Sequence, residues 1–126
     1  MNPSSSTSSP RVTIYHNARC SNSRGALAIL REQGIEPEIV DYIAQPLDVS
    51  QLKALIGLLR VPVRDVMRSK EAVFQELGLD AAGVSDSQLI EAIAQHPILL
   101  NRPIVVTGER ALLCRPPELV RNLLEN

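Results

Sequence analysis

A cysteine with polar and basic neighbours is the residue of this sequence best suited to chemistry. Cys20 lies between a predicted strand, residues 12–16, and a predicted helix that begins at Ser21. The thiolate is the nucleophilic form of cysteine, and the unpaired N–H groups of a helix N-terminus stabilise it. These groups belong to Ser21, Asn22 and Ser23. Arg24 lies four positions after Cys20, on the same helix face. The pattern predicts a reactive thiolate beside groups that bind an anion.

The helix alone cannot supply enough stabilisation for such a thiolate. A free thiol with a pKa near 8.5 is only about 3% ionised at pH 7, and lowering this pKa to about 6.5 needs roughly 2.7 kcal/mol. A helix N-terminus usually supplies about 0.3–1 kcal/mol. We expect the N–H groups of residues 21–23 and Arg24 to provide the rest. His16, four residues before Cys20, is expected to add a positive charge or orient a proton. A histidine held by local hydrogen bonds, without catalytic work, is the alternative.

The spacing of the cysteines argues against a dithiol mechanism. Ser23 stands where a Cys-x-x-Cys motif has its resolving thiol, so the reductant must come from outside the chain. Cys114 ends a predicted strand, and we expect it to be a structural thiol of the core. Two cysteines and two histidines provide neither a disulfide framework nor a metal site.

Composition limits the classes of partner. The chain has 126 residues, a formal net charge of −1 and 2% aromatic residues, which argues against nucleic-acid binding. It has no apolar run of about 18 residues and no secretory signal, so we expect a cytoplasmic monomer that binds no membrane. Residues 1–10 are rich in serine and are predicted to be a disordered tail, and 11–126 to be a single domain.

Periodicity predicts an α/β fold with a four-stranded mixed sheet of the glutaredoxin and thioredoxin type, in the order β-α-β, helical insertion, β-β-α. The first strand is followed by a helix that ends before Gly34 and by a strand over 38–43. Capping boxes at Asp48 and Ser85 begin two helices of the insertion. Shorter helices are expected over 63–67 and 72–77. Strands over 103–107 and 110–114 form a hairpin, and Pro116-Pro117 begins the last helix.

Three segments of the sequence carry a family resemblance. Residues 14–24 (IYHNARCSNSR), 96–106 (HPILLNRPIVV) and 113–118 (LCRPPE) resemble the glutaredoxin-dependent arsenate reductases. The resemblance implies that Cys20 attacks arsenate, and that glutathione, a co-substrate rather than a bound cofactor, and then glutaredoxin complete the reduction to arsenite. It also implies a cis-proline at Pro103.

By the same resemblance, three arginines bind the oxyanion: Arg68, Arg102 and Arg115. Planar guanidinium groups suit a tetrahedral anion, and together with Arg24 and the polar residues 21–23 they form the expected substrate site. For Arg68 the alternative is plain surface charge, because Arg60, Arg64 and Arg68 recur at the spacing of one helix face.

Two further functions stay open at this stage. Ser21 and Asn22 stand where the resistance-type reductases more often have Gly and Thr. A glutathione-linked thiol oxidoreductase of unassigned substrate, acting on protein mixed disulfides, is one alternative. A non-catalytic regulator of RNA polymerase, like the Spx-type proteins, is the other, although those usually carry the Cys-x-x-Cys motif that Ser23 interrupts here.

Overall fold

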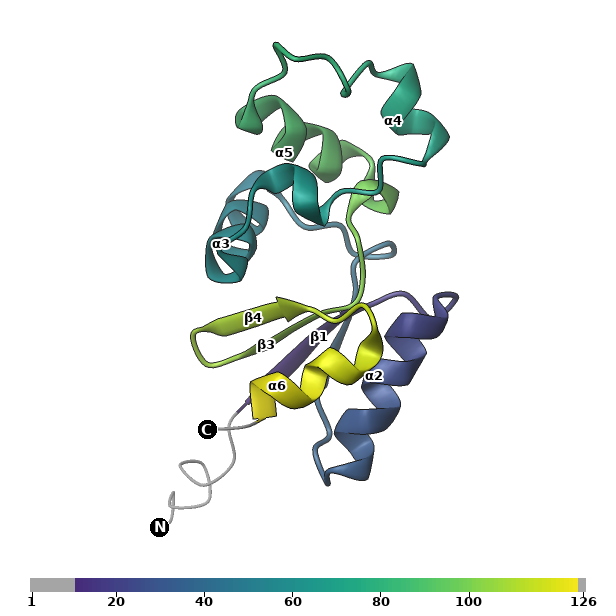
Figure 1. Cartoon of the computed structure of the whole chain (residues 1–126), viewed down its shortest axis with the longest axis vertical. Helices are drawn as coiled ribbons and strands as arrows, with labels where there is room; N and C mark the ends of the chain where they lie inside the picture. Colours follow the sequence, from purple (N-terminus) through teal and green to yellow (C-terminus); the bar gives the residue numbers. More distant parts are fainter. Residues whose placement is uncertain (1–10, 125–126) are drawn as a thin grey trace. The chain divides into compact units, whose positions relative to one another are not determined.

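A computed structural model describes residues 11–124, so the tail predicted at 1–10 lies outside the described residues. The elements of this part of the chain are as follows, with η for a 3₁₀ helix. They are β1 (Val12–His16), α2 (Ser21–Glu32), β2 (Glu38–Asp41), α3 (Val49–Leu59), η1 (Val63–Val66), α4 (Ala72–Glu76), α5 (Asp86–Gln95), η2 (Pro97–Leu99), β3 (Ile104–Thr107), β4 (Arg110–Leu113), η3 (Pro117–Leu119) and α6 (Val120–Leu124) (Figure 1). Two compact units share these elements, residues 1–40 with 102–126 (unit 1) and residues 41–101 (unit 2).

Unit 1 contains the sheet, which confirms the predicted α/β class. Its strand order is β2-β1-β3-β4, and β3 is antiparallel to both β1 and β4. Ile14 pairs with Val105, and Val105 with Leu112. Along β1, Val12, Ile14 and His16 are buried, in alternation with half-buried residues, as the period of a strand requires.

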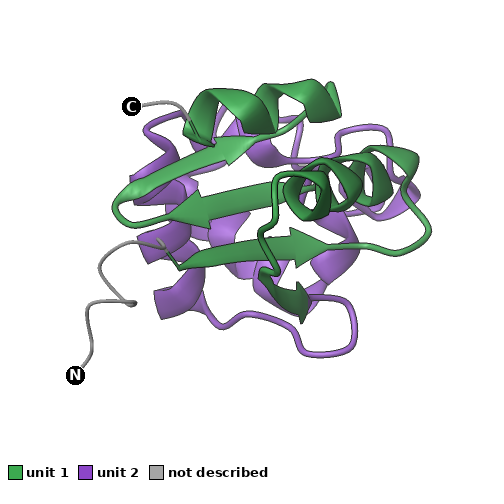
Figure 2. Cartoon of the chain, turned by 90° about the horizontal axis from the view of Figure 1, so that it is seen from below, with its two compact units in different colours: residues 1–40, 102–126 green, residues 41–101 purple. Residues whose placement is uncertain are grey.

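Helices α2 and α6 cover the buried row of this sheet (Figure 2). Ala26 and Leu30 of α2 and Val120 of α6 share one apolar cluster with the strands. The close approach of η3 to α2 depends on Gly25, because a Cβ at this position would lie 2.9 Å from Cγ of Pro117. Helix α2 therefore has a fixed position on the sheet, and its N-terminus lies at the end of β1.

The helical insertion forms unit 2. Both predicted capping boxes are present, at Asp48 for α3 and at Ser85 for α5, and each pairs a side chain with the N–H three residues on. The buried Tyr42 donates its hydroxyl hydrogen to the carbonyl oxygen of Leu100 at 3.2 Å, which joins the two ends of the unit. In the part of the chain that the structure describes, no helix combines the length and the apolar character of a membrane span.

Two element predictions were wrong in detail. The second strand ends at Asp41 rather than at residue 43, because the Asp41 carboxylate accepts the N–H groups of Ile43 and Ala44 and turns the chain. The helix expected over 63–67 is the four-residue 3₁₀ turn η1. The last helix begins as η3 and continues as α6.

Candidate active site

Cys20 is the residue that begins α2. Its backbone is extended, with φ −95° and ψ 123°, so it is the N-cap of the helix. A tight turn connects it to β1, in which the N–H of Cys20 donates to the carbonyl oxygen of Asn17 at 2.9 Å. The N–H of Arg19 donates to Oδ1 of the same Asn17 at 3.0 Å. The turn leaves the side chain of Cys20 partly exposed.

The surroundings of the Cys20 sulfur favour the thiolate. Partial burial is the largest single influence and raises the pKa of the thiol, but four others act against it. They are the backbone N–H of Ser23, a hydrogen bond from the Arg102 side chain, the N–H of Asn22, and the charge of Arg102. Together they lower the pKa of Cys20 to about 7, so roughly half of the protein carries a thiolate at neutral pH.

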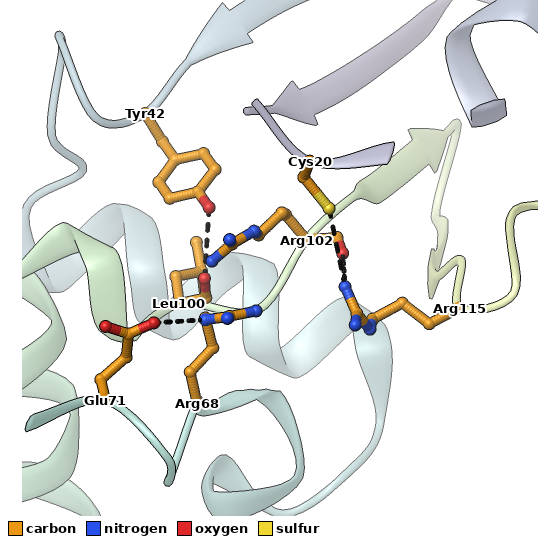
Figure 3. A network of polar contacts seen from close by, with 7 residues as sticks. All are labelled: Cys20, Tyr42, Arg68, Glu71, Leu100, Arg102 and Arg115. Carbon is orange, nitrogen blue, oxygen red and sulfur yellow. Dashed lines mark hydrogen bonds and ion pairs between the residues drawn. The ribbon is translucent and has the colours of Figure 1, made fainter. Parts of the chain in front are cut away.

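Arg115 reaches this sulfur in unit 1 (Figure 3), and Arg102 acts on it as well. Nη1 of Arg115 lies 3.7 Å from Sγ of Cys20 and donates to the carbonyl oxygen of Arg102 at 2.9 Å. Arg102 acts on the sulfur through its side chain, and the Arg102–Pro103 peptide bond is cis, as the resemblance implied. The Arg115–Pro116 bond is also cis, which the sequence analysis did not predict.

The polar residues of the first helical turn have separate roles. Ser21 is exposed, whereas Asn22 and Ser23 provide N–H groups that act on the sulfur. The Ser23 side chain is buried, and its Oγ accepts the N–H of Asn17 at 3.2 Å. Nη1 of Arg24 donates to the carbonyl oxygen of Ala18 at 2.8 Å. The structure therefore gives Arg24 a contact with the turn, and its predicted contact with substrate stays a prediction.

His16 lies in the row of β1 that packs toward α2, and it is 8% exposed. It lines an open hollow beside α2 together with Ala18 and Arg24. Its role in activating the thiol stays a prediction.

Arg68 belongs to unit 2, where the helix face expected from the spacing of Arg60, Arg64 and Arg68 is not formed. Arg60 ends α3, Arg64 lies in η1, and Arg68 follows η1, so the three do not share one helix face. Arg64 donates to the carbonyl oxygens of Leu79 and Ala81, and Nε of Arg68 pairs with Oε2 of Glu71 at 2.9 Å. Glu71 was not predicted from the sequence, although its spacing of three residues from Arg68 was a usable signal. That Arg68 binds the oxyanion stays a prediction.

Cys114 is a core thiol, as predicted. It is fully buried in the apolar cluster of unit 1, and burial raises its pKa to about 12. Its S–H points to the carbonyl oxygen of Leu112 at 3.6 Å. A thiol in this state is protonated and inert at neutral pH, so the reactive chemistry belongs to Cys20.

Comparison with known proteins agrees with this geometry. Residues 15–123 match the ArsC family. The chain belongs to the ArsC family. It is similar to proteins named arsenate reductase from Rhizobium meliloti (45% identity, 90% of this chain and 81% of that protein) and from Neisseria meningitidis serogroup A (43% identity, 91% and 99%). The solved structure of an arsenate reductase from Vibrio cholerae aligns with a TM-score of 0.89 at 43% identity, over 90% of this chain and 98% of that one.

Within the ArsC family chain, the described site of unit 1 can perform two tasks. A partly exposed sulfur with a pKa about 7 can attack an electrophile, since it is both charged and accessible. Two guanidinium groups and two helix amides at the same place can balance the negative charge of an anion that approaches the thiolate. The site is suited to attack on an electrophilic oxyanion.

Proposed function

We propose that this chain reduces arsenate to arsenite, with Cys20 as nucleophile, glutathione and then glutaredoxin as electron donors, and no bound cofactor. The observation that carries the proposal is the partly exposed Cys20 sulfur at the N-terminus of α2, with Nη1 of Arg115 at 3.7 Å. The helix amides and Arg102 lower the pKa of this thiol to about 7. The names of the relatives in R. meliloti, N. meningitidis and V. cholerae support arsenate as the substrate. The protein would act as a monomer in the cytoplasm, where glutathione is abundant and thiols stay reduced.

In the first step the Cys20 thiolate attacks arsenic(V). An S–As bond forms, and one arsenate oxygen takes up two protons and leaves as water. The sulfur donates its electron pair without a change in the oxidation state of arsenic. Arg102 and Arg115 would stabilise the anion and the charge that develops on its oxygens, and Arg68 is the third arginine proposed for this task.

The second step is the reduction. The thiolate of glutathione attacks the Cys20 sulfur, an S–S bond forms, and the S–As bond breaks. Its electron pair stays on arsenic, which becomes arsenic(III) and leaves as arsenite after protonation. Because Cys114 is buried and Ser23 is not a thiol, the chain needs this external thiol. Glutaredoxin then removes glutathione from Cys20 by thiol–disulfide exchange.

A coupled assay tests the proposal. The protein is mixed with glutathione, glutaredoxin, glutathione reductase and NADPH, and NADPH consumption is followed after arsenate is added. We expect arsenate-dependent consumption that Cys20→Ser abolishes, with a loss of at least about 1,000-fold, because the hydroxyl of serine is not ionised at neutral pH. Cys114→Ala is the matched control and keeps the activity, since this thiol takes no part in the chemistry.

Two outcomes would contradict the proposal. The first is a wild-type protein that consumes no NADPH with arsenate in the presence of both donors. If that protein instead removes glutathione from a glutathionylated protein, and arsenate does not affect the rate, the chain is a glutathione-linked thiol oxidoreductase. The second is a Cys20→Ser variant that retains the activity of the wild type.

A further inference from the structure

Two hydrogen bonds connect the turn that precedes Cys20 to the first turn of α2, which follows it. Oγ of Ser23 accepts the N–H of Asn17 at 3.2 Å, and Nη1 of Arg24 donates to the carbonyl oxygen of Ala18 at 2.8 Å. Both hydrogen bonds run from the helix back to residues that precede Cys20. They hold residues 17–18 close to residues 23–24, and this distance sets the position of the Cys20 sulfur relative to the helix amides.

We propose that Ser23 and Arg24 are positioning residues, which hold the Asn17–Cys20 turn against α2 so that the Cys20 sulfur faces the backbone amides of the helix. Neither side chain needs to touch the substrate for this role. This role rests on the proposed function, which gives the thiolate its task as nucleophile. The geometry itself can be tested without arsenate.

The distance between the sulfur and the amides is what the two bonds control. A hydrogen bond weakens steeply as its distance and angle depart from the optimum. The N–H of Ser23 is the strongest of the influences that lower the pKa of Cys20, and the hydroxyl of the same residue holds the turn. A loosened turn would therefore move the sulfur away from the amide that stabilises it most.

Ser23 stands where a Cys-x-x-Cys motif has its second thiol, and its buried hydroxyl has a structural role there. Its side chain is fully buried, and Oγ is engaged as the acceptor of a backbone N–H. A cysteine sulfur is a weak acceptor, so a resolving thiol at this position would hold Asn17 less firmly. The fourth residue of the Cys-x-x-Ser segment thus supports the single thiol instead of reacting with it.

The first test changes Ser23. Cys20 is alkylated with iodoacetamide over a range of pH, the modified residue is located by mass spectrometry, and the midpoint of the rate profile is compared between variants. We expect Ser23→Ala to raise this midpoint by about 0.5–1 pH unit, because the loosened turn weakens the contact between the thiolate and the amide of residue 23. Ser23→Thr keeps a hydroxyl acceptor, and its midpoint stays close to that of the wild type.

The second test changes Arg24, an exposed residue whose replacement leaves the core intact. We expect Arg24→Met to raise the same midpoint by a few tenths of a pH unit. Arg31→Met is the matched control, because Arg31 lies on the same helix and pairs with Glu36; its midpoint is unchanged. The alkylation of Arg24→Met is repeated at 1 M NaCl, which screens surface charges much more than it weakens a hydrogen bond. If the bond to Ala18 is responsible, the midpoint stays raised at this salt concentration.

Three results would overturn the inference. One is an unchanged midpoint in Arg24→Met. Another is a shift in Arg24→Met that disappears at high salt, which would assign the effect to charge. The third is a Ser23→Thr variant that behaves like Ser23→Ala, both being folded by circular dichroism. If the wild-type protein fails to reduce arsenate while these midpoints shift as expected, the proposed substrate is wrong and the positioning role stands.

Discussion

At the scale of single residues, the charge state of Cys20 links stability to pH. Its pKa is about 7 in the folded protein and near 8.5 in an unfolded chain. The thiolate therefore stabilises the fold above the unfolded pKa, and this contribution is lost as the pH falls through about 7. We expect Cys20→Ser to lose about 1 kcal/mol more stability at pH 9.5 than at pH 6, a value reduced by solvent screening of the partly exposed sulfur.

Urea denaturation of the wild type and Cys20→Ser at both pH values measures this difference. Cys114→Ala is the comparison of opposite sign. Burial raises the pKa of Cys114 to about 12 in the folded protein, whereas the unfolded thiol ionises near 8.5, so its replacement costs less stability at pH 9.5 than at pH 6. Equal losses for Cys20→Ser at pH 6 and pH 9.5 would show that the folded protein does not favour the thiolate.

Arg102 and Arg115 lie at the same sulfur, but we expect their replacement to have different effects. Arg102 acts on the sulfur by a hydrogen bond and by charge, whereas Nη1 of the exposed Arg115 is 3.7 Å away and is shared with a carbonyl oxygen. Arg102→Met should raise the pKa of Cys20 by about 0.5–1 unit, and Arg115→Met by less. Each should raise the KM for arsenate at least about tenfold, because each removes a charged donor.

Alkylation profiles and steady-state kinetics check these two effects separately. Arg121→Met, an exposed arginine of α6, is the control and changes neither quantity. A larger pKa change in Arg115→Met than in Arg102→Met would contradict the arrangement described here.

At the scale of elements, the contact between α2 and η3 sets the position of the active-site helix. A Cβ at Gly25 would lie 2.9 Å from Cγ and 3.1 Å from Cβ of Pro117, and the ring cannot rotate away. We expect Gly25→Ala to destabilise the protein by about 1 kcal/mol, since overpacking outweighs the helix propensity of alanine. Gly57→Ala in α3 is the control, because its new Cβ meets nothing within 4 Å besides its chain neighbours and the nearby backbone of its own helix. We expect it to stabilise the protein by about 0.5–1 kcal/mol. Denaturation curves would contradict this if both variants were stabilised.

Local signals made much of the fold predictable. The alternation along residues 12–16, the two capping boxes and Gly34 at the end of α2 each specify an element through its own residues. The early end of β2 was not predictable in the same way. It depends on the Asp41 carboxylate folding back on two N–H groups, whereas the β-branched residues around it favour a longer strand.

The candidate site was predictable where it depends on residue type and position. Cys20 and the helix amides were found in this way, whereas Arg102 and Arg115 were predicted from the resemblance to the arsenate reductases. The roles of Ser23 and Arg24 were not, because both depend on hydrogen bonds to the backbone of the turn, whose path the sequence does not reveal. The sequence predicted substrate contacts for these two residues, and the structure adds their contacts with the turn.

At the scale of the whole molecule, unit 1 contains Cys20, Arg102 and Arg115, and unit 2 contains Arg68. Our proposal needs Arg68 as the third arginine. Its Nε is bound by Glu71, which leaves its Nη groups to bind an anion. We expect Arg68→Met to raise the KM for arsenate about tenfold without changing the pKa of Cys20 in the absence of arsenate. Arg60→Met is the control and alters neither; an unchanged KM in Arg68→Met would exclude Arg68 from the site.

The proposed reaction requires that the Cys20 sulfur is an accessible thiolate at an anion-binding site. The most direct measurement is the rate of iodoacetamide alkylation of Cys20 in the wild-type protein as a function of pH, with and without arsenate. We expect a midpoint near pH 7 and a several-fold slower reaction when arsenate is present. A midpoint at pH 8.5 or above, or a rate that arsenate does not change, would contradict it.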